Sequence, residues 1–152
     1  MSVTTDLTDG LAALIAATAS PAIAWKPAAA YASTDTGLYR KTIPASPDRG
    51  IAITVIPQGD NPSQPYGQVM IQLKGRGLPN NPTDVDDLLD SVFAFLHGAT
   101  NLVLGSVTVI QINRGVRVPM GQDDSKRWEL IDQYYADLNY PPTSNRPYAG
   151  SW

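Results

Sequence analysis

The sequence predicts an α+β fold, with one mostly antiparallel sheet of four to six strands and two helices packed on it. Two amphipathic stretches have helical spacing, and several β-branched or alternating stretches are separated by loops that contain Gly and Pro. Thirteen Pro and twelve Gly residues disfavour a helix bundle. With 152 residues, 43% of them hydrophobic, the chain can bury one core, so residues 1–152 are expected to form a single domain.

The first predicted helix covers residues 4–18. Its apolar residues recur at helical spacing at Leu7, Leu11, Leu14 and Ile15. Thr4 or Thr5 is expected to cap its start. In residues 19–49, four Pro residues interrupt each helical pattern. A loop of this length in a small domain is expected to pack on something, with room for a short strand at residues 38–43.

Two strands are predicted next, at residues 50–57 and 67–74. The first is rich in β-branched residues and suits burial on both faces, whereas the second alternates between apolar and polar residues. Residues 58–66 between them contain two Pro and a Gly–Asp–Asn cluster. The two strands are therefore expected to form a hairpin with a long mobile tip.

The strongest helix prediction covers residues 84–97. Its apolar stripe consists of Val85, Leu88, Leu89, Val92, Phe93 and Leu96. The opposite face carries Asp86, Asp87 and Asp90. Thr83 is expected to cap this helix at its start, and Gly98 is expected to end it.

The last part of the chain predicts strands at residues 107–113 and near 116–119, a polar loop at 121–126, and one long strand from Arg127 to Leu138. A strand of about a dozen residues is roughly twice the usual length. Pro141–Pro142 ends the ladder. Residues 139–152 are then expected to form an extended arm. We expect it to pack on an adjacent subunit or a partner protein through Tyr140, Arg146, Tyr148 and Trp152.

Charge is distributed unevenly along the chain. The net charge of −3 argues against a protein whose main task is to grip nucleic acid. No Lys or Arg lies between Arg76 and Arg114, and that gap holds four acidic residues, Asp84, Asp86, Asp87 and Asp90. Basic residues gather just after it, at Arg114, Arg117, Lys126 and Arg127. This distribution predicts a fold with separate acidic and basic surfaces.

The sequence contains no pattern typical of an enzyme, a cofactor site or a metal site. It has no Cys, and its one histidine, His97, is expected to interact with the end of a helix. The four Asp residues at 84–90 fan around a helix rather than converge on an ion. Gly75–Arg76–Gly77 predicts a strand-ending turn, not a phosphate loop. A small hydrolase that uses His97 with Ser91 or Ser106 is a competing hypothesis.

Targeting signals are also lacking. The first helical stretch is too short and too polar at its flanks for a signal peptide, and no apolar run approaches about 20 residues. We therefore expect the protein to be made and kept in a cytoplasm, or in a particle assembled there, without a membrane partner.

Several short pieces of the sequence come in an order that resembles one family. They are Tyr31 to Tyr39, Pro47 to Ala52, Gln72 to Gly77, Asp84 to Asp87, Leu96 to Gly98, Gly121 to Tyr135, and Asn145 to Pro147. The chain resembles the tail terminator or minor capsid proteins of phages with long, non-contractile tails that infect actinobacteria. The resemblance extends from near Trp25 to Pro147, and it depends on the order and spacing of the pieces.

The resemblance implies a structural protein of the virion, assembled in the host cytoplasm, without an active site or cofactor. It implies a ring, typically a homohexamer, at the head-proximal end of the tail tube. That ring stops tube polymerisation and provides the surface to which the head connector docks. Its partners are other copies of itself, the tail tube protein, a head-completion or connector protein, and genomic DNA that passes without specific binding.

Within such a ring, the residues would have different roles. Asp84, Asp86, Asp87 and Asp90 are candidates to line a channel in which DNA slides without sticking, since phosphate attraction is what makes DNA binding tight. Candidates for contacts between subunits or with partners are Arg114, Arg117, Arg127, Tyr140, Arg146, Tyr148 and Trp152.

Two further hypotheses compete with a tail terminator. Another neck component, a head-completion or stopper protein, would also form a ring, but we would expect it to be rich in β-barrel and to lack the strong second helix. A monomeric binding module would be separated from a ring by light scattering.

Overall fold

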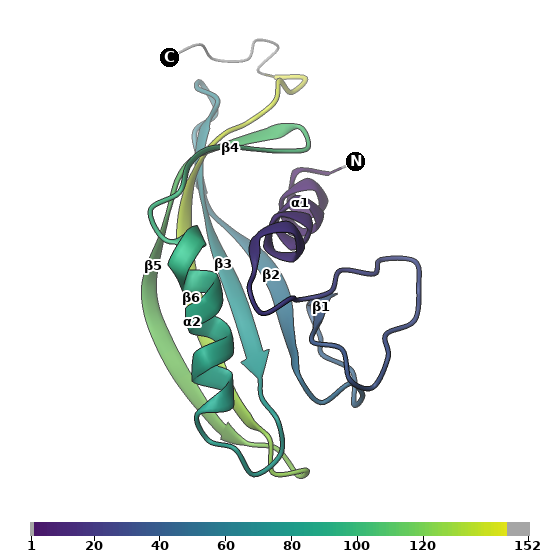
Figure 1. Ribbon diagram of the computed structural model, residues 1–152. Coiled ribbons are helices and arrows are strands. Elements are labelled where there is room, and N and C mark those ends of the chain that lie inside the picture. The colour runs from purple at the N-terminus through teal and green to yellow at the C-terminus, as the bar shows by residue number, and fades with distance from the viewer. Residues whose placement is uncertain (1, 146–152) are drawn as a thin grey trace.

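The computed structural model describes residues 2–145 (Figure 1). In this part of the chain there are two helices and one six-stranded sheet. The elements are α1 (Val3–Thr18), β1 (Gly37–Arg40), β2 (Gly50–Asp60), β3 (Tyr66–Arg76), α2 (Asp84–Leu96), β4 (Thr100–Leu104), β5 (Val107–Gln122) and β6 (Trp128–Asn139). The strand order is β1-β2-β3-β6-β5-β4, and only β1 and β2 pair in parallel. The predicted α+β class is confirmed.

Both helices lie on the same face of the sheet, which curves around them (Figure 1). Helix α1 contacts β1, β2 and β4, and helix α2 contacts β3, β5 and β6. The core between these layers takes buried apolar side chains from both helices and from each of the six strands. The opposite face of the sheet carries no helix within the described residues.

Helix α1 starts one residue earlier than predicted. Its cap is Ser2, whose hydroxyl accepts a hydrogen bond from the Thr5 backbone N–H at 3.1 Å. The prediction that Thr4 or Thr5 caps this helix is wrong, because both residues already lie in its first turn.

The β2–β3 hairpin is longer than the sequence predicted. The strands extend to Asp60 and from Tyr66, so the tip consists of residues 61–65 only. A register shift between Pro57 and Gly59 lets the ladder continue past a residue that has no backbone N–H.

Helix α2 buries the predicted stripe and ends at Leu96, followed by Gly98 at φ +81°. Thr83, however, makes no side-chain capping bond. The neighbouring carboxylate of Asp84 instead accepts a hydrogen bond from the Leu78 backbone N–H at 2.8 Å and pairs with Arg49 at 2.8 Å. The first turn is therefore fixed by a contact with the preceding loop and with a residue far away in the sequence.

The two strands predicted between residues 107 and 119 form one 16-residue strand, β5. Three register shifts against β6 explain why its alternation is broken in the sequence. Strand β4, which was not predicted, forms a hairpin with the start of β5. Strand β6 has 12 residues, as expected for the long strand.

The segment of residues 19–49 packs on the domain in part, as expected. Ile23 is 3% exposed, Trp25 packs against the core, and Ala24 forms a bridge with Gly37 at the start of β1. Strand β1 ends at Arg40, since Lys41 has φ +67°. Residues 27–34, in contrast, stand out from the body, and all of them except Tyr31 are exposed.

Candidate assembly surfaces

Arg117 links the sheet to the acidic face of α2. It faces Asp132 across the β5–β6 ladder and binds both of its carboxylate oxygens, at 2.6 and 2.9 Å. The same guanidinium lies 3.4 Å from Asp86 and 2.9 Å from Asp90. Asp132 is fully buried, and its hydrogen bonds raise the pKa of Arg117. Arg117 therefore neutralises a buried carboxylate, and the acids of the helix surround it.

Arg114 joins this cluster at its edge. Its guanidinium is 3.7 Å from Asp132 and stacks 4.0 Å from the centre of the Phe93 ring on α2. The Arg114 backbone N–H donates to Nδ1 of His97 at 3.0 Å, and the His97 ring stacks on Phe93 at 4.7 Å. His97 therefore fixes the end of α2 to β5.

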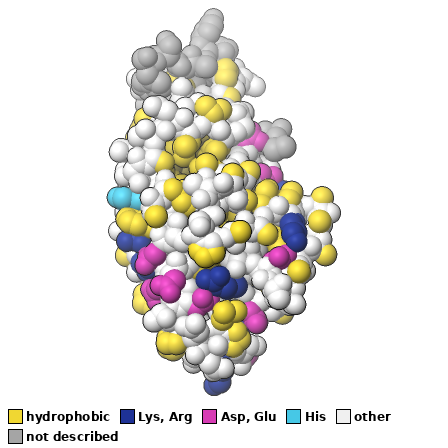
Figure 2. All heavy atoms as spheres, viewed as in Figure 1, with side chains coloured by type: hydrophobic (Ala, Val, Ile, Leu, Met, Phe, Trp, Pro, Cys, Tyr) yellow, Lys and Arg dark blue, Asp and Glu magenta, His cyan; other side chains and the backbone are white. Residues whose placement is uncertain are grey.

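Among residues 2–145, acidic and basic side chains are not divided between separate surfaces, contrary to the prediction from the sequence. Figure 2 shows acidic and basic side chains next to each other on the helix-covered face. The reason is that Arg117 projects from the sheet towards α2, where it meets two of the four acids. Asp84 is held by Arg49 and has only 12% of its side chain exposed. The carboxylates that remain open to solvent are those of Asp86, Asp87 and Asp90.

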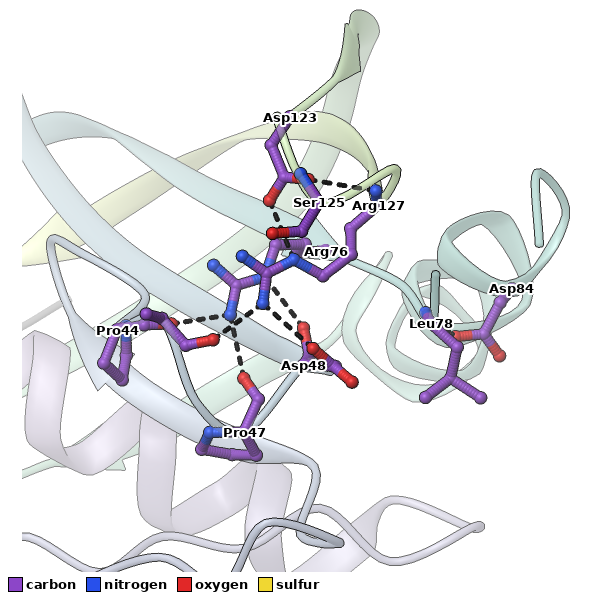
Figure 3. Close-up of polar contacts among 10 residues, drawn as sticks. Pro44, Pro47, Asp48, Arg76, Leu78, Asp84, Asp123, Ser125 and Arg127 are labelled. Carbon is purple, nitrogen blue, oxygen red and sulfur yellow. Dashed lines mark hydrogen bonds and ion pairs between the residues drawn. The ribbon is translucent and has the colours of Figure 1, made fainter. Parts of the chain in front are cut away.

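Arg127, a candidate interface residue, is an internal staple. Its side chain is 8% exposed, lies 2.8 Å from Asp123 and 3.0 Å from Asp48, and donates to the Ala45 carbonyl at 2.7 Å (Figure 3). Such bonds leave its guanidinium little capacity to bind a neighbouring subunit. Within the polar loop predicted at residues 121–126, Asp123 forms a turn, since its carboxylate accepts from the Ser125 backbone N–H.

Arg76 is a second internal staple, and no pattern in the sequence predicted this role. Its guanidinium donates to the carbonyl oxygens of Pro44, Pro47 and Asp48 at 2.6, 2.8 and 2.7 Å (Figure 3). The residue is 5% exposed. Burial lowers the pKa of this arginine, and the nearby charge of Arg127 lowers it further. The two arginines together tie residues 44–48 to the end of the sheet.

The arm begins on the subunit's own sheet. The Tyr140 backbone N–H donates to the Pro65 carbonyl at 2.6 Å, its ring packs against Gly67, and Asp60 accepts a hydrogen bond from its phenol. Tyr140 therefore completes the hairpin of its own subunit, and its contact with a neighbour stays a prediction. Arg146, Tyr148 and Trp152 lie outside the described residues.

A largely apolar groove of about 500 Å³ lies where this arm passes α1. Its walls come from the start of α1, the tip of the β2–β3 hairpin and the arm, and include Val3, Leu7, Pro57, Val69 and Tyr140.

The helix-free face of the sheet has a patch of ten residues without a charged side chain. They lie in register on four strands, with side chains opposite to those in the core: Thr54, Ile56, Met70, Gln72, Asn113, Val116, Val118, Ile131, Gln133 and Tyr135. We call this patch the open face. An antiparallel sheet with one face in water normally shows polar side chains there. Six of these ten are apolar or aromatic, so the patch is typical of a surface that another molecule covers.

The groups of the competing hydrolase hypothesis do not meet. The Ser91 hydroxyl donates to the Leu88 carbonyl at 2.6 Å, and Ser106 binds the Asp6 carboxylate. His97 is engaged with Arg114. Within residues 2–145, no group of three acidic, His or Cys side chains is placed to hold a metal ion. In the same range, no helix combines the length and the apolar character needed to cross a membrane.

The sequence of residues 17–140 matches the family of bacteriophage tail terminator proteins. This region contains α2 and all six strands described above. The chain belongs to the bacteriophage tail terminator family. No curated protein matches the chain. Membership of the family gives the protein a structural role in the phage tail and agrees with the resemblance noted in the sequence.

Proposed function

We propose that this protein forms a ring on the head-proximal end of the phage tail tube. There it stops tube polymerisation and presents the surface to which the head connector docks. The family match over residues 17–140 carries this proposal, because it includes nearly the whole folded domain. The open face supports it, since an uncharged sheet surface of this kind suits repeated contacts between copies.

The proposal can be tested by measuring the subunit number by light scattering, for the protein alone and with purified tail tube protein. A ring, with a hexamer as the expected size, should appear in at least one of the two conditions. A monomer in both would contradict the ring and would favour a simple binding module.

We propose that the solvent-open carboxylates of Asp86, Asp87 and Asp90 face the channel through which DNA leaves the head. Reversal of all three charges is not a clean test, since Asp86 and Asp90 contact Arg117. Asp87 is exposed and makes no side-chain hydrogen bond or ion pair with another described residue, so Asp87→Lys should leave folding unchanged. Phage particles that carry this variant should eject DNA more slowly. Ejection at the wild-type rate would remove Asp87 from the channel wall.

We also propose that the protein has no catalytic role, which the engagement of His97, Ser91 and Ser106 in structural bonds supports. A stopper or head-completion role is the second candidate, but no observation on the fold favours it over tail termination. Assembly would take place in the host cytoplasm, before the tail joins the head.

A further inference from the structure

The loop of residues 27–34, like the open face, is a surface that other parts of the subunit leave largely uncovered. Its exposed residues are small or carry a single hydroxyl: Pro27, Ala28, Ala29, Ala30, Ala32, Ser33 and Thr34. None of them is charged, whereas 16% of the chain is. Small side chains let the backbone of such a loop come close to a flat surface.

The loop is held in one shape at its base. Lys26 pairs with Asp35 at 2.7 Å across the two ends of the loop, and Asp35 also accepts from the Ala32 backbone N–H at 2.8 Å. The Tyr31 hydroxyl accepts from the Lys26 backbone N–H at 3.0 Å and donates to the Leu38 carbonyl. A loop ordered before binding loses less conformational entropy when it docks.

The loop and the open face are two different surfaces of the subunit. The loop projects beyond the β1 edge of the sheet, while β5 and β6, which carry six of the ten residues of the open face, lie towards the other side (Figure 1). A closed ring needs two different, complementary patches on opposite sides of each copy. The loop lies beyond the β1 edge and shares no residue with the open face, which extends from β2 to β5, so one copy can use each surface for a different neighbour.

The chemistry of the two surfaces also matches. Neither surface contains a charge, and Lys74, which borders the open face next to Ile131, is already paired with Glu129 at 3.0 Å, so no unpaired charge would be desolvated. The side chains of Gln72, Asn113 and Gln133 make no hydrogen bond with other described residues, so their amides are available to the backbone groups of a loop. The apolar residues around them, such as Met70 and Ile131, can cover Pro and Ala side chains.

We propose that, in the ring, residues 27–34 of one copy dock on the open face of the next copy. This inference rests on the ring of the proposed function and adds which surfaces form its repeated contact. The contact is head-to-tail, because the loop and the open face are different surfaces of the same chain.

The natural chain has no Cys, so introduced cysteines report only on the chosen positions. One variant carries Ala29→Cys and another Gln133→Cys. The two are mixed, assembled into rings and treated with a short bismaleimide cross-linker. A covalent dimer is expected on a denaturing gel. The matched control replaces Gln133→Cys by Asp87→Cys, an exposed position on the helix-covered face, and should give no dimer above background.

Rings that form normally without cross-linked dimer, or with equal dimer in the control, would overturn the docking of the loop and leave the ring in place. Failure of wild-type protein to form any ring, alone or with tube protein, would overturn both.

A test with introduced charges gives a second readout. Ala29→Arg should weaken assembly at least tenfold, and Gln133→Glu on the same chain should restore part of it. An Ala29→Arg variant that assembles like wild type would also contradict the proposal.

Discussion

Replacement of Arg117 by Met should destabilise the domain more than any change on the exposed side of α2. The variant keeps an aliphatic side chain of similar length and removes the guanidinium. Asp132, fully buried, then loses the partner that binds its two oxygens at 2.6 and 2.9 Å. Only Arg114 remains near it, at 3.7 Å.

Removal of one partner from a buried ion pair costs about 3–5 kcal/mol. Arg117 keeps 21% of its side chain exposed, and Arg114 offsets part of the charge, so we take the lower end, about 3 kcal/mol. For a domain of this size, each kcal/mol lowers the Tm by about 2–4 °C, which gives a decrease of about 6–12 °C. Thermal unfolding followed by circular dichroism measures this directly.

Two control variants separate the buried pair from the exposed ones. Asp90→Asn removes a partner that is 60% exposed and should cost less than about 1 kcal/mol. The double variant Arg117→Met, Asp132→Leu removes both charges and should recover much of the loss, because the uncompensated carboxylate is gone. The reasoning is refuted if Arg117→Met unfolds within about 1 kcal/mol of wild type, or no earlier than Asp90→Asn.

Three further predictions concern the ends of the sheet. Arg76→Met should cost about 3 kcal/mol, since three carbonyls, one of them in a buried hydrogen bond, lose a charged donor, and hydrogen exchange should speed up in residues 44–48. Burial, and then the bond to Asp60, raises the pKa of Tyr140 to about 12 from 10.0. Its contribution to stability is therefore complete below pH 10 and lost as the pH rises towards 12, and Asp60→Asn should lower this pKa in a tyrosinate absorbance titration. Truncation after Asn145 should leave the Tm within a few degrees of wild type but produce overlong or headless tails; normal joined tails would show that residues 146–152 have no such role.

The elements that local patterns determine were predictable from the sequence. Helix α2 has a stripe with a single period, and its boundary at Leu96 follows from Gly98, which adopts the left-handed conformation. Strand β6 alternates between buried and part-exposed residues from Ile131 to Asn139. In both cases, the residues that define the element are neighbours in the sequence.

Strand β4 could not be predicted in this way, because its place depends on α1. The turn that joins it to β5 is held by the Asp6 carboxylate, which accepts from the Ser106 backbone N–H at 3.0 Å across about a hundred residues of sequence. The strand itself is short and follows a helix without a clear alternation. Contacts of this range leave no periodic trace in a single sequence.

The candidate site residues were predictable as a set but not in their roles. The distribution of charges along the sequence correctly indicates that Arg114 and Arg117 follow an acidic helix. The distribution of charges does not indicate that the Arg117 side chain projects from β5 towards this helix. The direction of this side chain depends on the register of β5 with Asp132 on β6. The structural roles of Arg76 and Arg127 could not be predicted for the same reason. Their partners in residues 44–48 are loop carbonyls and one carboxylate, which are far away in the sequence.

In the proposed function, this protein ends the growth of a tail tube. The most direct measurement is the length distribution of tubes, by electron microscopy, when purified tail tube protein polymerises with increasing amounts of this protein. We predict that the mean length falls as the ratio rises and that tubes carry a ring at one end. An unchanged length distribution at every ratio, with the added protein still folded by circular dichroism, would contradict the account.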